Sequence, residues 1–130
     1  MNIFLDANVL VSVFNKEYPV FSYSSRILSL SLNKRYRLFT SPVCLAIAFY
    51  FSEKKSGSLL ARKKIELLEK NISITDVGRK QVSDTLADKR ILDFEDGIEY
   101  FSALYAKCQL IITENVSDFH FSKMEVLNSK

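Results

Sequence analysis

Residues 2–10 read N-I-F-L-D-A-N-V-L, and this stretch decides how the chain is interpreted. The apolar run over residues 2–5 ends at Asp6, and apolar side chains then recur at helical spacing at positions 9, 10, 13 and 14. The first pattern predicts a short strand and the second a helix that follows it at once. Asp6 is therefore expected at the junction between a buried strand and a helix.

The same alternation of strand and helix continues along the chain. We expect strands at 36–39, 72–75 and 110–112, and an edge strand within 121–127. A helix should follow Pro19, and others should cover residues 43–51, about 59–68, 78–89 and 94–107. The helix over 43–51 is apolar almost all round, so it should be buried on several sides and end in a polar turn at 52–57. The helix over 94–107 is marked by apolar residues at spacings of three and four, namely Phe94, Ile98, Phe101, Leu104 and Tyr105.

Strands that alternate with helices indicate parallel pairing and a sheet covered on both faces. The predicted fold is an α/β class, three-layer α/β/α sandwich with a central, mostly parallel sheet of four or five strands. A chain of 130 residues with 48% hydrophobic content can bury a sizeable core, and nothing in it resembles a linker or a repeat. We expect one domain over residues 1–130.

The two cysteines lie far apart in apolar surroundings, without the spacing of a metal site. Cys44 and Cys108 are therefore expected to be small buried side chains in a reducing compartment. The N-terminus has no signal-peptide pattern and no apolar run is long enough for a membrane span, so a cytoplasmic location is expected. The net charge is +3 and is unevenly placed, because residues 1–65 hold ten Lys/Arg and three Asp/Glu, whereas residues 66–130 hold eight and twelve. A basic half can meet phosphate groups, although solvated helix faces explain the same pattern.

Three acidic residues fall where an α/β sheet usually carries its functional groups, at the carboxyl ends of strands. Asp6 ends the first strand, Asp96 opens the helix over 94–107, and Asp118 follows the strand over 110–112. Clustered carboxylates repel one another unless a cation lies between them, and oxygen ligands suit Mg²⁺ or Mn²⁺. A purely structural alternative exists, because Asp93 can cap the helix and the helix dipole favours Glu95 and Asp96 in its first turn.

The motifs F-L-D-A-N-V-L (4–10), D-F-E-D-G (93–97) and I-I-T-E-N-V-S-D-F (111–119) together resemble those of the PIN domain family. Their order and spacing match, and the resemblance covers nearly the whole chain. It implies that Asp6, Asp96 and Asp118 are catalytic and hold the metal. The polar residues Asn8, Glu95, Thr113 and Asn115 would support them. Thr113 and Asn115 also suit the simpler role of capping the turn after the strand.

The sequence departs from the family pattern at one position. The family usually carries a Glu in the helix after the second strand, and Ile47 stands near that place here. Three outcomes are open: the metal is held by fewer protein ligands, Glu95 or Glu53 reaches the site, or the domain no longer cleaves.

The resemblance implies a metal-dependent endoribonuclease that cleaves RNA phosphodiester bonds with metal-activated water, as a toxin of a toxin–antitoxin pair. A cognate antitoxin and a homodimer are the protein partners that such kinship suggests. The alternative is a catalytically impaired PIN fold that binds RNA or protein. A receiver or haloacid-dehalogenase phosphatase also places Asp after its first strand, but Asp6-Ala7-Asn8 lacks the second Asp of a D-x-D pair.

The single histidine and the basic residues have weaker functional signals. The single histidine, His120, has no triad partner and is not expected to act as a general base, so it should lie at the surface or at an edge. An RNA path could use some of the basic residues, most of which should simply be solvated: Lys34, Arg35, Arg37, Lys54, Lys55, Arg62, Lys63 and Lys64.

Overall fold

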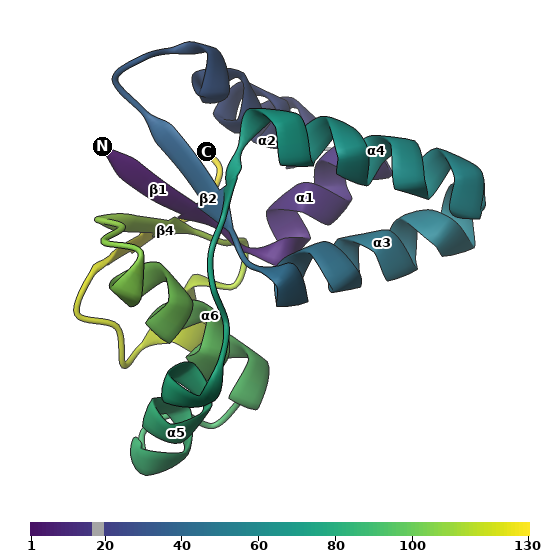
Figure 1. Cartoon of the computed structure of the whole chain (residues 1–130). Helices are drawn as coiled ribbons and strands as arrows, with labels where there is room; N and C mark the ends of the chain where they lie inside the picture. The colour runs from purple at the N-terminus through teal and green to yellow at the C-terminus, as the bar shows by residue number, and fades with distance from the viewer. Residues whose placement is uncertain (17–19) are drawn as a thin grey trace.

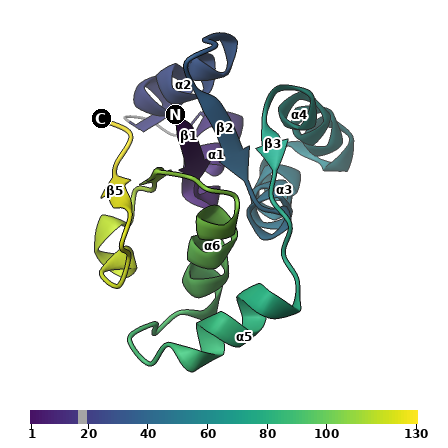
Figure 2. The same cartoon turned by 60° about the vertical axis from the view of Figure 1, so that its left-hand side comes forward.

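One sheet of five strands organises the chain in a computed structural model that describes residues 1–16 and 20–130. The strands are β1 (Asn2–Leu5), β2 (Arg37–Thr40), β3 (Ser73–Ile74), β4 (Leu110–Ile112) and β5 (Glu125–Leu127). Their order is β3-β2-β1-β4-β5, and every neighbouring pair is parallel (Figure 2). The predicted parallel α/β sheet is confirmed, including the edge strand near the C-terminus.

Two layers of helices flank this sheet, and the strand order explains their placement. The helices are α1 (Ala7–Phe14), α2 (Val20–Ser29), α3 (Pro42–Ser56), α4 (Ser58–Asn71), α5 (Arg79–Ala87) and α6 (Phe94–Tyr105), with short 3₁₀ turns η1 (Leu30–Leu32) and η2 (Val116–Phe119). The connections β1-to-β2 and β2-to-β3 run in one direction across the sheet, whereas β3-to-β4 runs back. Right-handed crossovers therefore put α1–α4 on one face and α5–α6 on the other, as Figure 1 shows.

The strand order reverses between β1 and β4, the two central neighbours. At such a point the loops that leave the two strands diverge to opposite faces, and a crevice opens at the carboxyl ends of the strands. Asp6 directly follows β1 and Thr113 directly follows β4. The fold thus brings the first and last sequence motifs to one place.

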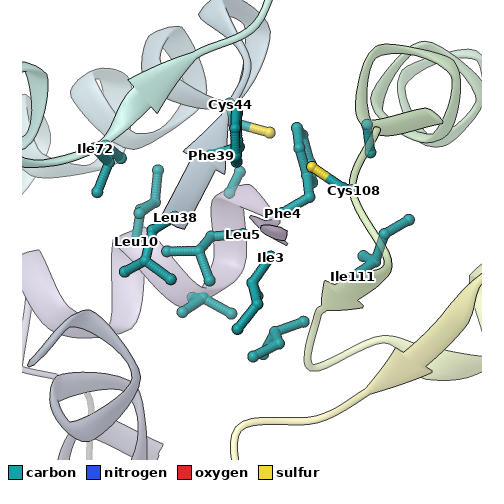
Figure 3. Close-up of a cluster of buried hydrophobic side chains, with 14 of the residues drawn as sticks. Ile3, Phe4, Leu5, Leu10, Leu38, Phe39, Cys44, Ile72, Cys108 and Ile111 are labelled. Atoms are coloured by element: carbon teal, nitrogen blue, oxygen red, sulfur yellow. The ribbon is translucent and has the colours of Figure 1, made fainter. Parts of the chain in front are cut away.

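The core lies on both sides of β1. Phe4, Leu5 and Ile111 are fully buried, and Cys44 and Cys108 are buried free thiols among these apolar side chains, as predicted (Figure 3). A sheet buried on both faces requires such continuous apolar strands. Among residues 1–16 and 20–130, no helix has the length and apolar character needed to cross a bilayer.

Helix α3 differs from its prediction in length and in burial. Ser41 caps it through a 3.1 Å hydrogen bond from the Cys44 N–H, and Pro42 occupies its first turn. The helix then runs through the expected polar turn to Ser56 and ends at Gly57, whose φ of 85° suits a residue without Cβ. Its apolar surface is not buried on several sides, because α1 and α4 cover only part of it and Tyr50 and Phe51 stay exposed.

Helix α6 forms as predicted, but its buried face is not the one that the large apolar residues mark. The buried residues are Gly97, Ile98, Glu99, Tyr100, Ser102 and Ala103, while Phe94, Leu104 and Tyr105 are exposed. Close packing against α5 explains the difference: a Cβ on Gly97 would lie 2.3 Å from Thr85 Cγ2. Small residues are needed where the two helices meet, so the large ones lie at the margin. The residue before α2, Pro19, lies outside the described residues.

Candidate active site

Asp6 is held rigidly where β1 passes into α1. Its side chain is 6% exposed and caps α1, with Oδ1 accepting a 2.6 Å hydrogen bond from the Ala7 N–H. Oδ2 accepts a 2.7 Å hydrogen bond from the Thr113 hydroxyl. The two oxygens of Asp6 are therefore oriented by one donor that follows β1 and one donor that follows β4.

Thr113 joins these two loops through its hydroxyl. The oxygen that donates to Asp6 also accepts from Asn8 Nδ2 at 3.2 Å and from the Asn115 N–H at 3.1 Å. Asn8 Oδ1 in turn accepts from the Glu114 N–H at 3.1 Å. Thr113 thus contacts Asp6 and also caps the turn after β4, so both roles considered from the sequence are present in the geometry.

Asp96 and Asp118 line the same open cavity as Asp6, a space of about 430 Å³ above the carboxyl ends of β1 and β4. Asp96 is half-buried in the first turn of α6, where the Asp93 side chain caps the helix by accepting from the Asp96 N–H at 3.2 Å. Asp118 is exposed in η2. The full lining is Asp6, Ala7, Asn8, Val11, Ile47, Phe51, Asp93, Glu95, Asp96, Glu99, Asn115 and Asp118.

Glu99 is a fourth acid in this cavity, and the sequence analysis missed it. It lies one turn after Asp96 on α6 and is only 2% exposed. A carboxylate oxygen of Glu99, one of Asp6 and the Cys44 Sγ all lie within 4.8 Å of one another. Its spacing of three residues from Asp96 was the available signal, because residues at i and i+3 share one helix face.

The two acids considered as replacements for the family's Glu behave differently. Glu95 is exposed and lines the cavity, so it remains near the site. Glu53 is exposed on α3 and is not among the described residues that line the cavity. Ile47, which stands near the place of the family's usual Glu, does line the cavity.

The negative charge of the cavity is uncompensated by protein. Six of its twelve lining residues carry carboxyl groups, and none of these described residues is Lys or Arg. Burial, and then the neighbouring carboxylates of Asp93 and Asp6, raise the pKa of Asp96 to about 7. Burial and the charge of Asp6 raise the pKa of Glu99 well above its usual value. Such shifts are typical of functional sites, where a bound cation or a proton must balance the charge.

A divalent cation fits these residues. The donors are mostly carboxylate oxygens, the ligands that Mg²⁺ and Mn²⁺ prefer. Glu99 Oε2 has no hydrogen-bond partner within residues 1–16 and 20–130, although it is buried. A buried oxygen without a donor is destabilising, and a cation would satisfy it.

Comparison with known proteins assigns the family. Residues 2–117 match the family model described as "PIN domain". The chain belongs to the PIN domain family. A curated relative of this PIN domain is ribonuclease VapC1 of Aquifex aeolicus (strain VF5), 26% identical over 135 residues that cover 98% of this chain and 90% of the relative.

Solved structures agree on the fold of this PIN domain. VapBC2 from Rickettsia felis, bound to a DNA fragment from its promoter, matches with a TM-score of 0.74 and 19% identity over 98% of both chains. VapC20 from Mycobacterium tuberculosis, a toxin that cleaves the sarcin-ricin loop, matches with a TM-score of 0.67 and 16% identity over 84% of this chain and 86% of that one. At these identities the likeness establishes the fold alone.

The basic residues of this PIN domain lie mostly away from the cavity. Lys34 and Arg35 precede β2 and Arg37 opens it, so all three lie at the amino ends of the parallel strands. Lys55 and Lys64 donate hydrogen bonds to the backbone carbonyls of Asn15 and Phe14 at the end of α1, the second at 2.6 Å.

Lys54 is connected to the rim of the cavity through two aromatic rings. Its ammonium lies 4.5 Å from the Tyr50 ring centroid, and the edge of that ring meets Phe51, which lines the cavity. His120 is exposed, as predicted.

Proposed function

We propose that this PIN domain is a metal-dependent endoribonuclease whose Asp6, Asp96 and Asp118 hold Mg²⁺ or Mn²⁺. The observation that carries the proposal is the cavity at the β1/β4 reversal, in which these acids converge without a neutralising cation from the protein. The relative named as a ribonuclease supports RNA as the substrate class.

The chain's own residues would act mainly by orientation. Thr113 and the Ala7 N–H fix both oxygens of Asp6, so this carboxylate keeps one direction toward the cavity. The Asn8 side chain and the Asn115 N–H donate hydrogen bonds to the Thr113 hydroxyl oxygen and so orient it. Residues of this kind position a metal ligand without contacting the metal. A divalent ion, when bound by these acids, would supply Lewis-acid activation of water and stabilise charge on the scissile phosphate.

The rim of the cavity offers contacts for a nucleic acid strand. Phe51 is 44% exposed beside the acids, and Lys54 lies over its neighbour Tyr50. An exposed ring can stack on a base, and an ammonium can meet a phosphate. We propose that RNA enters along this side of α3.

The test is cleavage of structured and single-stranded RNA by the purified chain, with Mg²⁺, with Mn²⁺ and with excess chelator. Wild type should cleave only with metal, Asp6→Asn should abolish cleavage, and Glu66→Gln, which removes an exposed carboxylate on α4, should not matter. Cleavage by Asp6→Asn at the wild-type rate, or cleavage in chelator, would refute the proposal.

A module that binds RNA or protein without cleaving is the second candidate, and Ile47 favours it. This apolar side chain lines the cavity at the position where the family usually has a carboxylate. Calorimetric titration with Mn²⁺ separates the two functions, because a protein that gives no binding heat cannot be a metal-dependent nuclease.

We also propose an antitoxin as protein partner in the cytoplasm, as the two-protein VapBC complex among the related structures suggests. An apolar groove between α1, α2 and α4 is suited to an amphipathic helix, with Leu60 and Leu67 44% and 65% exposed in its lining. The product of a neighbouring gene should co-purify with wild type and not with Leu67→Asp. Retention by Leu67→Asp would exclude this groove.

A further inference from the structure

Glu99 is a buried acid of the cavity whose carboxyl group contacts Asp6 and Cys44 by hydrogen bonds and still keeps one oxygen without a partner among the described residues. It lies on the buried face of α6, 2% exposed, with one carboxylate oxygen in reach of Asp6 and Cys44. One oxygen of this carboxyl group, Oε2, is buried without a hydrogen-bond partner among the residues that the structure describes. Buried polar atoms are almost always paired, so an unpaired carboxylate oxygen that faces a cavity points to a ligand.

Helix α3 contributes apolar side chains and no acid to the lining of the cavity. Ile47 lines the cavity from α3, and its helical neighbours Cys44 and Ala48 are fully buried and carry no charge. Helix α3 thus contributes no carboxylate, whereas α6 contributes two, Asp96 and Glu99, which are one turn apart on the same face.

We propose that Glu99 supplies a carboxylate ligand in place of one from α3, so that it binds the divalent cation together with Asp6, Asp96 and Asp118. This inference rests on the proposed metal dependence and names a ligand for it. Cys44 stays a neutral neighbour, because Mg²⁺ and Mn²⁺ prefer oxygen to sulfur. The metal ligands would then surround the point between β1 and β4 where the strand order reverses, and none of them would come from α3.

The experiment measures Mn²⁺ affinity of the metal-free chain by calorimetry, with electron paramagnetic resonance of free Mn²⁺ as a second measurement. Glu99→Gln keeps the shape of the side chain and removes its charge, and it should weaken Mn²⁺ binding at least tenfold. Glu66→Gln removes an equal charge on the exposed side of α4 and should leave the affinity unchanged. If Glu99→Gln does not fold by circular dichroism, Glu99→Asp takes its place and should also bind at least tenfold more weakly.

A rescue variant tests the idea more sharply. Ile47→Glu combined with Glu99→Gln returns a carboxylate to the cavity from α3, and it should restore Mn²⁺ affinity to within threefold of wild type. A Glu99→Gln protein that binds Mn²⁺ as tightly as wild type overturns the inference. So does a double variant as weak as Glu99→Gln, since a carboxylate returned to the cavity would then fail to replace Glu99 as a ligand.

These outcomes separate the two proposals. A wild-type chain that binds no Mn²⁺ overturns metal dependence and this inference together. A wild-type chain that binds Mn²⁺ and loses nothing in Glu99→Gln overturns the assignment of Glu99 alone, and leaves Asp6, Asp96 and Asp118 as the ligands.

Discussion

Thr113→Val should destabilise the metal-free protein by roughly 2–3 kcal/mol. Valine fills the same volume but lacks the hydroxyl, which is fully buried and makes three hydrogen bonds. The bond to the Asp6 carboxylate contributes about 2 kcal/mol and the two neutral bonds about 1 kcal/mol each, about 4 kcal/mol in all. Because Asn115 is exposed and Asn8 half-buried, water can replace part of the neutral bonds and lower the total.

Urea unfolding in excess chelator measures this loss, and Thr113→Ser is the matched control. Serine keeps the hydroxyl and removes one methyl group, so it should cost only about 1 kcal/mol. Both variants should unfold with the wild-type dependence on urea, which shows that the exposed surface is unchanged. A Thr113→Val protein that is as stable as Thr113→Ser would refute the idea that this hydroxyl holds the two central loops together.

Three further predictions follow from other parts of the structure. Gly97→Ala should destabilise the protein by roughly 1–3 kcal/mol in urea unfolding despite the helix preference of alanine, because the new Cβ would meet Thr85 Cγ2 at 2.3 Å. Adding Thr85→Ser, which removes that methyl group, should recover part of the lost stability. A Gly97→Ala protein more stable than wild type would contradict this packing. The folded-state pKa of Asp96, about 7 against an ordinary 3.8, contributes stability that is complete at low pH and is lost as pH rises through about 7. The melting temperature of the metal-free protein should therefore fall from about pH 5 to about pH 7.5, and Asp96→Asn should flatten this fall. Cys44 and Cys108 are buried thiols, and burial raises the pKa of both, that of Cys108 to about 12. A disulfide reagent at about pH 8 should therefore modify them far faster in denaturant than in the native protein. Equal rates of modification would contradict their burial.

The sequence was sufficient to locate Asp6, Asp96 and Asp118 near one another. Each of the three lies next to a boundary between elements, and boundaries at the carboxyl ends of parallel strands meet at one edge of a sheet. A local pattern also predicted the cap of α6, because Asp93 precedes a helix whose first N–H groups need an acceptor. These features depend on neighbouring residues alone, so the sequence carries them directly.

Glu99 and the exposure of α3 depend on contacts between distant segments. The large apolar residues of α6 suggested a buried face that included Phe94 and Leu104, and nothing in that pattern pointed to Glu99. In the structure Gly97 packs against Thr85 of α5, and Glu99 lies among the buried residues of α6. Which face is buried was set by the partner helix, and periodicity within α6 could not reveal it.

The same contact gives Gly97 a part in the site. Gly97 lies between Asp96 and Glu99 on one turn of α6, and its lack of a Cβ fixes how closely this turn approaches α5. A helix is stiff over one turn, so a displacement at Gly97 moves Asp96 and Glu99 together, whereas Asp6 stays fixed by Thr113 and the Ala7 N–H. The distance between the acids of β1 and those of α6 is therefore set on the far side of the helix, by packing against α5. Gly97→Ala should for this reason weaken Mn²⁺ binding as well as stability, although glycine itself carries no ligand atom in its side chain.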